Sequence, residues 1–252
     1  MKSSSGHEGR HYLVVGASSG IGASIALELA SLEANITMVA RRTEKMLELW
    51  QRMAPGSHAC YGFDVSRLSE IFALVEKIDA ERGAIDGCVY CAGVGAAMRL
   101  RGLLPEKLHA VMRVNFYAFV EFVRALARKK RKEQDLRIVA LSSLASISSD
   151  KYKTAYSASK AAMDAAVRCL SRELASNRVT INSIRPAVVD VERLRGLDEL
   201  TGGLDAEIKK NGYQPLGIIP PKDIAGMAAW LLSDAARYLT GTSLPFNGGA
   251  AC

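Results

Sequence analysis

Tyr156 and Lys160 are the first pair whose types and spacing could do chemistry. On a helix, a separation of four residues puts both side chains on one face, one turn apart. A free phenol has a pKa of roughly 10, so it is a poor proton donor or acceptor at neutral pH. A nearby ammonium favours the phenolate and makes the phenol useful as a general acid–base. The same spacing also occurs in ordinary surface pairs, so the rest of the chain must decide.

The residues that follow Tyr156 predict the helix that would hold this pair. Small and apolar residues recur at helical spacing on one side, and Ser159, Arg168 and Arg172 take the other side. The members of the apolar stripe are Ala158, Ala162, Ala165, Ala166, Cys169, Leu170 and Leu174.

A glycine-rich turn follows the first apolar run, residues 12–15, and precedes a helical pattern that includes Ile25 and Leu29. Glycines let backbone amides approach a pyrophosphate at a helix N-terminus, where the dipole favours negative charge. The turn could instead be only a tight connection, but its position between a strand and a helix favours dinucleotide binding. The residues expected to bind are Gly16, Ser18, Ser19, Gly20, Ile21 and Gly22.

The residues at the end of the second apolar run, residues 35–40, indicate whether a dinucleotide-binding protein prefers NAD or NADP. A carboxylate there would bind the ribose hydroxyls of NAD, whereas an arginine accommodates the 2′-phosphate of NADP. Ala40 stands at that position, and Arg41 and Arg42 follow. Cations are disfavoured at a helix N-terminus, which favours an anion-binding role over an ordinary basic helix start. We therefore expect NADP(H), with NAD(H) as the less favoured cofactor.

Short apolar runs alternate with helical stretches along the chain, a pattern typical of a parallel sheet covered on both faces. We expect a single-domain α/β fold of Rossmann type, with a doubly wound, mostly parallel, seven-stranded sheet. The carboxyl ends of such strands line the ligand crevice. The runs are residues 12–15, 35–40, 58–63, 87–91, 137–141, 179–184 and a short one near 244–246, with a last helix over 222–233.

Asn115 lies inside a long apolar helical pattern that begins near Pro105. A buried amide is costly unless its hydrogen bonds are satisfied. The side chain could bond backbone groups, or bend the helix and hold a water, and the two roles are compatible.

The domain boundaries follow from composition. Residues 1–10 are polar with no apolar stretch, so we expect a loose tail rather than a secretory signal. Residues 11–252 would form the single domain. The irregular stretch 187–217 has a weak helical pattern at 205–210, and a loop of that length is typically a lid or binding segment.

Charge and cysteine content narrow the function classes. The net charge of +7 permits phosphate, acidic-cofactor, nucleic-acid or anionic-surface binding. The basic run 128–132 ends a helix and has no interleaved aromatic residues, which favours a solvated face over a nucleic-acid patch. Cys88 and Cys91 spell C-x-x-C within a strand, where they face opposite ways, so we expect no metal site. Five cysteines with no export signal, and no membrane-spanning run, favour a cytoplasmic location.

The motifs together resemble those of the short-chain dehydrogenase/reductase family, from residue 12 to residue 249. The resemblance implies that Tyr156 is the acid–base and that Lys160 lowers its pKa and binds the nicotinamide ribose. It further implies that Ser143 polarises the substrate carbonyl and that Asn115 holds a proton-relay water. The motifs are Gly16 to Gly22, Asp64-Val65, Ala92-Gly93, Asn115, Ser143, Tyr156 to Lys160, Pro186 and Asn247-Gly248-Gly249. The implied cofactor contacts also include Cys91, and the backbones of Val188 and Val189.

The chain departs from the family pattern at four positions. Cys91 replaces an asparagine, Ala187 replaces a glycine, and Val15 replaces the threonine before the first glycine. Val191 replaces a threonine that commonly touches the carboxamide. These changes leave the expected catalytic set intact but weaken any inference about substrate.

The expected function is NADP(H)-dependent interconversion of a carbonyl and an alcohol. Within this class, 3-oxoacyl-(acyl-carrier-protein) reductase is the alternative; a non-catalytic NADP(H)-binding sensor or scaffold is the alternative of another class. The expected partners are a small-molecule substrate and further copies of the chain, in a dimer or homotetramer, with no nucleic acid and no membrane.

Overall fold

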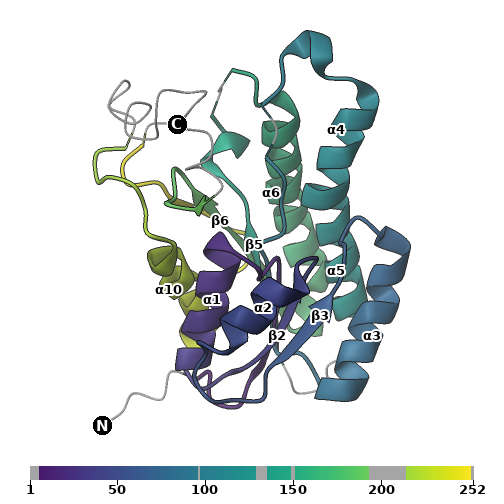
Figure 1. The fold of residues 1–252 in the computed structure, drawn as a ribbon, viewed down its shortest axis with the longest axis vertical. Helices are drawn as coiled ribbons and strands as arrows, with labels where there is room; N and C mark the ends of the chain where they lie inside the picture. Colours follow the sequence, from purple (N-terminus) through teal and green to yellow (C-terminus); the bar gives the residue numbers. More distant parts are fainter. Residues whose placement is uncertain (1–5, 96, 129–134, 149–150, 193–213, 251–252) are drawn as a thin grey trace.

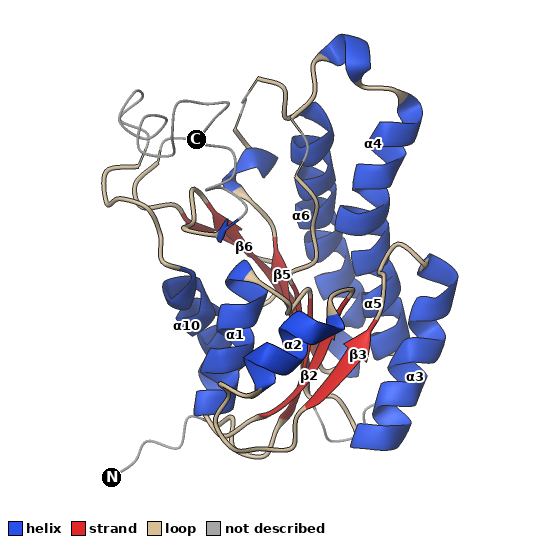
Figure 2. Ribbon diagram, viewed as in Figure 1, coloured by secondary structure: helices blue, strands red, loops and turns tan. Residues whose placement is uncertain are grey.

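One seven-stranded parallel sheet forms the centre of the protein, in the order β3-β2-β1-β4-β5-β6-β7 (Figures 1 and 2). The computed structural model describes residues 6–95, 97–128, 135–148, 151–192 and 214–250. The strands are β1 His11–Val15, β2 Asn35–Ala40, β3 Ala59–Gly62, β4 Gly87–Tyr90, β5 Leu136–Leu141, β6 Val179–Pro186 and β7 Ser243–Phe246. The predicted fold class is confirmed, and every strand of the sheet is parallel to its neighbours.

Helices cover both faces of this sheet (Figure 2). The first face carries α1 Gly20–Ser31, α2 Thr43–Trp50 and α10 Pro221–Leu232, and the second carries α3 Ile71–Arg82, α5 Ala118–Ala127 and α6 Thr154–Leu174. The α4 helix, Pro105–Met112, continues into α5 through a π-helix, η3 Arg113–Tyr117. Short 3-10 turns complete the described elements: η1 Leu68–Glu70, η2 Leu100–Gly102, η4 Leu144–Ser146, η5 Ala175–Asn177 and η6 Asp234–Ala236.

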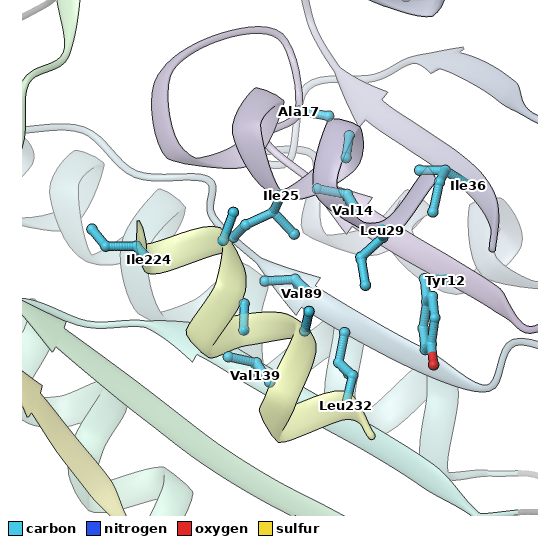
Figure 3. Close-up of a cluster of buried hydrophobic side chains, with 14 of the residues drawn as sticks. Tyr12, Val14, Ala17, Ile25, Leu29, Ile36, Val89, Val139, Ile224 and Leu232 are labelled. Atoms are coloured by element: carbon cyan, nitrogen blue, oxygen red, sulfur yellow. The ribbon is translucent and has the colours of Figure 1, made fainter. Parts of the chain in front are cut away.

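Alternation along the buried strands supplies a separate core to each face. On β1, Tyr12 and Val14 pack with Ile25 and Leu29 of α1 and with the apolar side of α10 (Figure 3). Leu13 and Val15 point to the opposite core, which α3, α5 and α6 cover. Burial on both faces explains why these strands are continuous apolar runs.

Strand order reverses beside β1, which pairs with β2 on one side and with β4 on the other. In open parallel sheets, ligands bind outside the carboxyl ends of the strands at such a switch point. The glycine-rich turn after β1 therefore lies next to the chain that leaves β4.

The buried face of α6 differs from the predicted one. Ala155, Ser159, Met163 and Val167 are buried, whereas Ala158 of the predicted apolar stripe is exposed. Ser159 can be buried because its hydroxyl donates to the Tyr156 carbonyl at 2.7 Å. The stripe prediction is confirmed for Ala166, Leu170 and Leu174, which pack against the core. It is wrong at Ala158 and Cys169, which are exposed, and it treated the buried, hydrogen-bonded Ser159 as a solvent-facing residue.

The expected loose tail is also corrected, for residues 6–10. His7 is only 2% exposed, and its Nδ1 lies 2.8 Å from the Tyr12 hydroxyl. Arg10 forms an ion pair with Asp234 at 2.8 Å. These contacts pin the segment against the amino end of β1, and residues 1–5 lie outside the described part.

Two other sequence-based expectations fall largely outside the described residues. The lid 187–217 is described only up to Glu192 and again from Gln214, and of the basic run only Arg128 is described. Arg128 lies 3.7 Å from a Glu76 carboxylate oxygen and stacks over the Phe72 ring. In the described part of the chain, no helix is long and apolar enough to cross a membrane.

Candidate active site

A cleft of about 690 Å³ opens at the carboxyl ends of the strands, where β1 and β4 meet. Its volume lies in the range of small-molecule and cofactor sites, roughly 300–1,000 Å³. It brings together residues from five separate segments that the sequence singled out. The predicted site residues that line it are Gly16, Ser18, Ser19, Gly20, Ile21, Gly22, Arg41, Arg42, Asp64, Val65, Cys91, Ala92, Gly93, Tyr156 and Lys160.

The glycine-rich turn is shaped by close backbone contacts. Gly16 has φ +89°, and a Cβ there would lie 2.6 Å from the Ala92 amide nitrogen. A Cβ on Gly22 would lie 2.3 Å from the Gly16 carbonyl oxygen. Ser19 precedes α1 without a side-chain cap, so the first amides of this helix are left for a ligand in the cleft. This arrangement fits the pyrophosphate of a dinucleotide.

Cations gather at the end of the cleft that follows β2. The Arg42 guanidinium donates to the Ser18 hydroxyl at 3.1 Å and to the Ser19 hydroxyl at 2.7 Å. Arg41 and Lys45 line the same region. Arg42 thereby bridges the end of β2 and the glycine-rich turn, and the side chain that ends β2, Ala40, carries no carboxylate.

Asp64 lies beside this region, after β3. The Ser66 backbone N–H donates to its carboxylate at 2.9 Å, and this hydrogen bond holds the pKa of Asp64 below its usual range, with Arg41 and Arg67 adding to the effect. The carboxylate is therefore ionised and oriented at neutral pH.

Asn115 joins the chain after β4 to α6. It is fully buried; its Oδ1 accepts from the Val94 N–H at 2.8 Å, and its Nδ2 donates to the Val94 carbonyl at 3.1 Å and to the Ser159 hydroxyl at 2.9 Å. The first of the two predicted roles, bonding backbone groups, is therefore present.

The helix containing Asn115 also departs from regular geometry. Asn115 sits in the π-helix η3, where the Ala118 N–H reaches back to the Arg113 carbonyl. The carbonyl of Val114 accepts instead from the buried Tyr90 hydroxyl. A π-turn of this kind is frequent at functional sites.

Tyr156 and Lys160 are neighbours on α6, as the spacing predicts. The Lys160 ammonium lies 5.9 Å from the centroid of the Tyr156 ring, and it donates to the Leu141 carbonyl at 2.5 Å. Lys160 is 4% exposed. A Cβ on Gly93 would lie 3.5 Å from Asn115 Oδ1 and 3.6 Å from Lys160 Nζ. Lys160 lines the cleft, whereas Asn115 lies behind Gly93 and is not among the lining residues.

Two serines follow β5, and the structure gives them different surroundings. Ser143 begins the η4 turn, and its hydroxyl accepts from the Ala145 N–H at 3.2 Å. Ser142 is buried and lines the cleft. Among the described residues that line the cleft, Ser142 is present and Ser143 is not, so the sequence-based choice of Ser143 as the substrate-binding hydroxyl stays a prediction.

Cys91 lines the cleft between the glycine-rich turn and Lys160. Burial raises the pKa of its thiol to about 12, although the Lys160 charge acts in the opposite direction. Cys88 packs in the other core, so the two cysteines do face opposite sides of the sheet. Across the residues that the structure describes, no three His, Cys, Asp or Glu side chains gather as a potential metal site.

The segment after β6 contains the two backbones, of Val188 and Val189, that are predicted to contact the cofactor. The Val188 N–H donates to Gln214 Oε1 at 2.9 Å, and its carbonyl accepts from Gln214 Nε2 and from the Ile219 N–H. Both backbone groups of Val188 are thus used within the chain. Val189, whose N–H has no acceptor among the described residues, is left for the expected carboxamide contact. Pro186 ends β6 and pairs with β7.

Several cleft residues were not anticipated from the sequence. Lys45 could have been found, since it lies one turn after Arg41 and Arg42 at the start of α2. Glu192 also lines the cleft, next to Val191, whose position the family resemblance had already linked to the carboxamide. Val191 Cγ1 lies 3.2 Å from where a Cβ on Gly20 would be. Their approach to the glycine-rich turn depends on long-range packing, which leaves no local signal.

Comparison with known proteins agrees with this geometry. A family model described as enoyl-(acyl carrier protein) reductase matches residues 16–251. The chain is 29% identical over 244 residues to the 3-oxoacyl-(acyl-carrier-protein) reductase FabG of Escherichia coli (strain K12), covering 96% of this chain and 97% of the relative. It is 30% identical over 243 residues to FabG of Chlamydia muridarum, covering 95% and 96%.

Solved structures point the same way. A crystal structure of 3-oxoacyl (acyl-carrier-protein) reductase from Agrobacterium tumefaciens C58 with NADP bound is 25% identical, with a TM-score of 0.88, and 99% of this chain and 98% of that chain are covered. The cleft, the strand order and these matches together show that the chain is an oxidoreductase belonging to the short-chain dehydrogenase/reductase family.

Proposed function

We propose that this protein uses NADP(H) to interconvert a carbonyl and a secondary alcohol, with Tyr156 as the general acid–base. The observation that carries the proposal is that Tyr156 and Lys160 line the same cleft as the glycine-rich turn. A proton-transfer group and a dinucleotide-binding turn in one cleft are what such a reaction requires.

The protein residues would supply proton transfer and orientation, because a bound nicotinamide cofactor supplies the hydride chemistry. In the reductive direction, the Tyr156 hydroxyl donates a proton to the substrate oxygen as negative charge grows there. Lys160, fixed by the Leu141 carbonyl, places a positive charge 5.9 Å from the centroid of the phenol ring. A hydroxyl from Ser143 would stabilise the same oxygen by hydrogen bonding.

The preference for NADP(H) is supported by the charges after β2. Arg42 is already oriented by Ser18 and Ser19, and Arg41 and Lys45 stand nearby. An arginine fork can bind a phosphate through two parallel hydrogen bonds. An acid that would bind the ribose hydroxyls of NAD is missing at Ala40. The bound NADP of the Agrobacterium tumefaciens reductase is consistent with this preference.

Reduction of a 3-oxoacyl group on an acyl-carrier protein is the favoured alternative within the same chemistry. It rests on the names of the FabG relatives, at 28–30% identity over nearly the whole chain. A basic surface would suit an acidic carrier, and the net charge of +7 is compatible with that. A non-catalytic NADP(H) sensor or scaffold remains the alternative from another class, and it would show binding without turnover.

We further propose that the protein assembles as a homo-oligomer. Ala158 and Cys169 of α6 are exposed in the single chain, although small and apolar residues of this kind suit contact with another helix. A dimer or tetramer built on α4, α5 and α6 would cover them, and analytical ultracentrifugation would measure the state directly. A cytoplasmic location stays a prediction.

A turnover screen tests the proposed function. Purified protein would be assayed with NADPH and with NADH against ketones, sugars and 3-oxoacyl thioesters, including a carrier-bound thioester. The expected result is faster oxidation of NADPH than of NADH with at least one carbonyl class. Saturable binding of NADPH with no turnover against the full panel would favour the sensor, and preference for the carrier-bound thioester would select the reductase of acyl carriers.

A further inference from the structure

Gln214 is a buried amide that no part of the proposed chemistry uses. Its side chain belongs to a residue only 3% exposed, just beyond the undescribed stretch 193–213. A carboxamide offers two donor hydrogens and an acceptor oxygen, and burial requires them to be satisfied. Here Oε1 accepts from the Val188 N–H at 2.9 Å, and Nε2 donates to the Val188 carbonyl at 3.2 Å and to the Gly217 carbonyl at 2.6 Å.

We infer that Gln214 is a positioning residue of the cofactor cleft, which holds the segment Val188–Glu192 against the glycine-rich turn. The inference rests on the proposed function, because it concerns the binding of the same cofactor. Val191 and Glu192 of this segment line the cleft, and Val191 lies over Gly20. Gln214 acts on them through the backbone of Val188.

The arrangement repeats one already described at the catalytic end of the site. Asn115 pairs its amide with both polar backbone groups of Val94, which lies after β4. Gln214 pairs its amide in the same way with Val188, which lies after β6. Each side chain thus completes the hydrogen bonding of a chain segment that has just left the carboxyl end of a strand. Both segments border the cleft.

Among the described hydrogen bonds, two backbone bonds also join residues 188–190 to Ile219. Val189 and Ile219 form an isolated parallel bridge, with hydrogen bonds from Asp190 N–H to the Ile219 carbonyl at 3.0 Å and from Ile219 N–H to the Val188 carbonyl at 3.1 Å. These are only two backbone hydrogen bonds, so the two hydrogen bonds between the Gln214 amide and the Val188 backbone are a large share of those that hold residues 188–190 in place. Its loss would loosen the segment that covers the glycine-rich turn.

The turn at Asn247 to Ala250 holds Gln214 from its other side. A Cβ on Gly248 would lie 2.9 Å from Gln214 Cγ, and the Leu216 N–H donates to the Gly248 carbonyl at 2.9 Å. Gly248 has φ +56°, a conformation that glycine adopts without strain. The closing Asn-Gly-Gly motif therefore leaves space for the Gln214 stem, which explains why the amide can reach Val188.

The test replaces Gln214 with methionine, which keeps the length and removes the amide. We expect the Kd for NADPH, measured by quenching of protein fluorescence, to rise about 10-fold, the effect of losing one to two net hydrogen bonds. The KM for NADPH should rise in parallel, while kcat at saturating cofactor stays within about twofold. Gln51→Met, at an exposed position after α2, is the matched control and should leave the Kd unchanged.

Two further measurements separate a positioning role of Gln214 from a purely structural one, and separate the test of Gln214 from the test of the proposed function. Gln214→Glu keeps an acceptor for the Val188 N–H and replaces the methionine variant if that variant does not fold; its Kd should be intermediate. A lower unfolding temperature with an unchanged Kd would overturn the positioning role. Wild-type protein that binds NADPH without turnover would defeat the proposed function, while the Kd comparison would still decide the role of Gln214.

Discussion

Asp164 of α6 and Arg185 of β6 form a partly buried ion pair one turn beyond Lys160. Arg185 Nε donates to Asp164 Oδ2 at 2.7 Å, and the side chains are 16% and 2% exposed, respectively. The Ser183 hydroxyl donates to the other carboxylate oxygen at 2.7 Å. The pair therefore fixes α6 against the sheet next to the proposed catalytic residues.

Removal of the arginine alone should be strongly destabilising, because it leaves a buried carboxylate without its partner. We expect Arg185→Met to lower the free energy of unfolding by about 3–5 kcal/mol. The double variant Asp164→Asn, Arg185→Met should recover a large part of this loss. Urea unfolding measures both, and Lys77→Met at an exposed ion pair with Glu81 is the surface control. Equal losses in the single and double variants would contradict the argument.

Tyr156→Phe should separate proton transfer from cofactor binding. The variant keeps the ring and its position above Lys160 but removes the proton that the reaction needs. Turnover is expected to fall at least about 100-fold, the usual contribution of general acid–base catalysis. The Kd for NADPH should remain at its wild-type value. Tyr238→Phe, at a residue 88% exposed, is the control and should keep full activity. Near wild-type turnover in Tyr156→Phe would reject the assignment of Tyr156.

Arg42→Gln should reduce the preference for NADPH over NADH. The substitution removes a charged donor group that Ser18 and Ser19 hold at the edge of the cleft. We expect the Kd for NADPH to rise about 10- to 100-fold, because hydrogen bonds to charged groups are worth roughly 1.5–3 kcal/mol. The Kd for NADH should change little. Arg52→Gln, exposed after α2, controls for the loss of one positive charge. An equal rise for both cofactors would show that Arg42 does not read the 2′-phosphate.

Stability should decrease as the pH falls below about 6.5, the ordinary pKa of histidine. Burial lowers the pKa values of His7 and His11 in the folded protein; Arg10 and Arg137 lower that of His7 further, while Asp234 acts in the opposite direction. The unfolded chain therefore binds more protons below that pH, and the folded state loses stability until the pH falls below the folded pKa values.

Thermal unfolding at pH 7.5 and pH 5.5 checks this expectation. His7→Gln should show a smaller difference between the two pH values than the wild type. His109→Gln, at an exposed residue of α4, should keep the wild-type difference. A His7→Gln variant with an undiminished pH effect would mean that other groups cause it.

The strands and the cleft could be predicted largely because their signals are local. The predicted bounds of β2 agree with the structure, since continuous burial on both faces gives an uninterrupted apolar run. The glycine-rich turn, Tyr156 and Lys160 were found from residue spacing together with the family resemblance, and the structure brings them to one cleft. The spacing of apolar residues within one segment predicts its secondary structure, because that spacing follows from which side of the element is buried.

The features that were missed depend on hydrogen bonds between distant segments. Ser159, Asp164 and Gln214 are polar in sequence but buried in the fold, since each has partners supplied from elsewhere in the chain. His7 is buried for the same reason, through Tyr12. When the hydrogen-bond partner of a polar residue lies far along the chain, the local sequence does not show that the residue is buried. For this reason Ser159 was placed on the exposed side of α6.

The π-turn between α4 and α5 has a consequence for how this region tolerates insertions and deletions. It holds one residue more than a regular helix would need, and in the α-helix each residue advances the chain by roughly 100°. Shortening residues 113–117 by one would let the hydrogen bonds return to regular α-helical spacing. The side chains that follow, Phe119 and Phe122 among them, would keep facing the core, because the wider turn absorbs one residue without rotating the helix after it. The π-turn thus lets the buried amide of Asn115 and the buried aromatic side chains of α5 belong to one continuous helix.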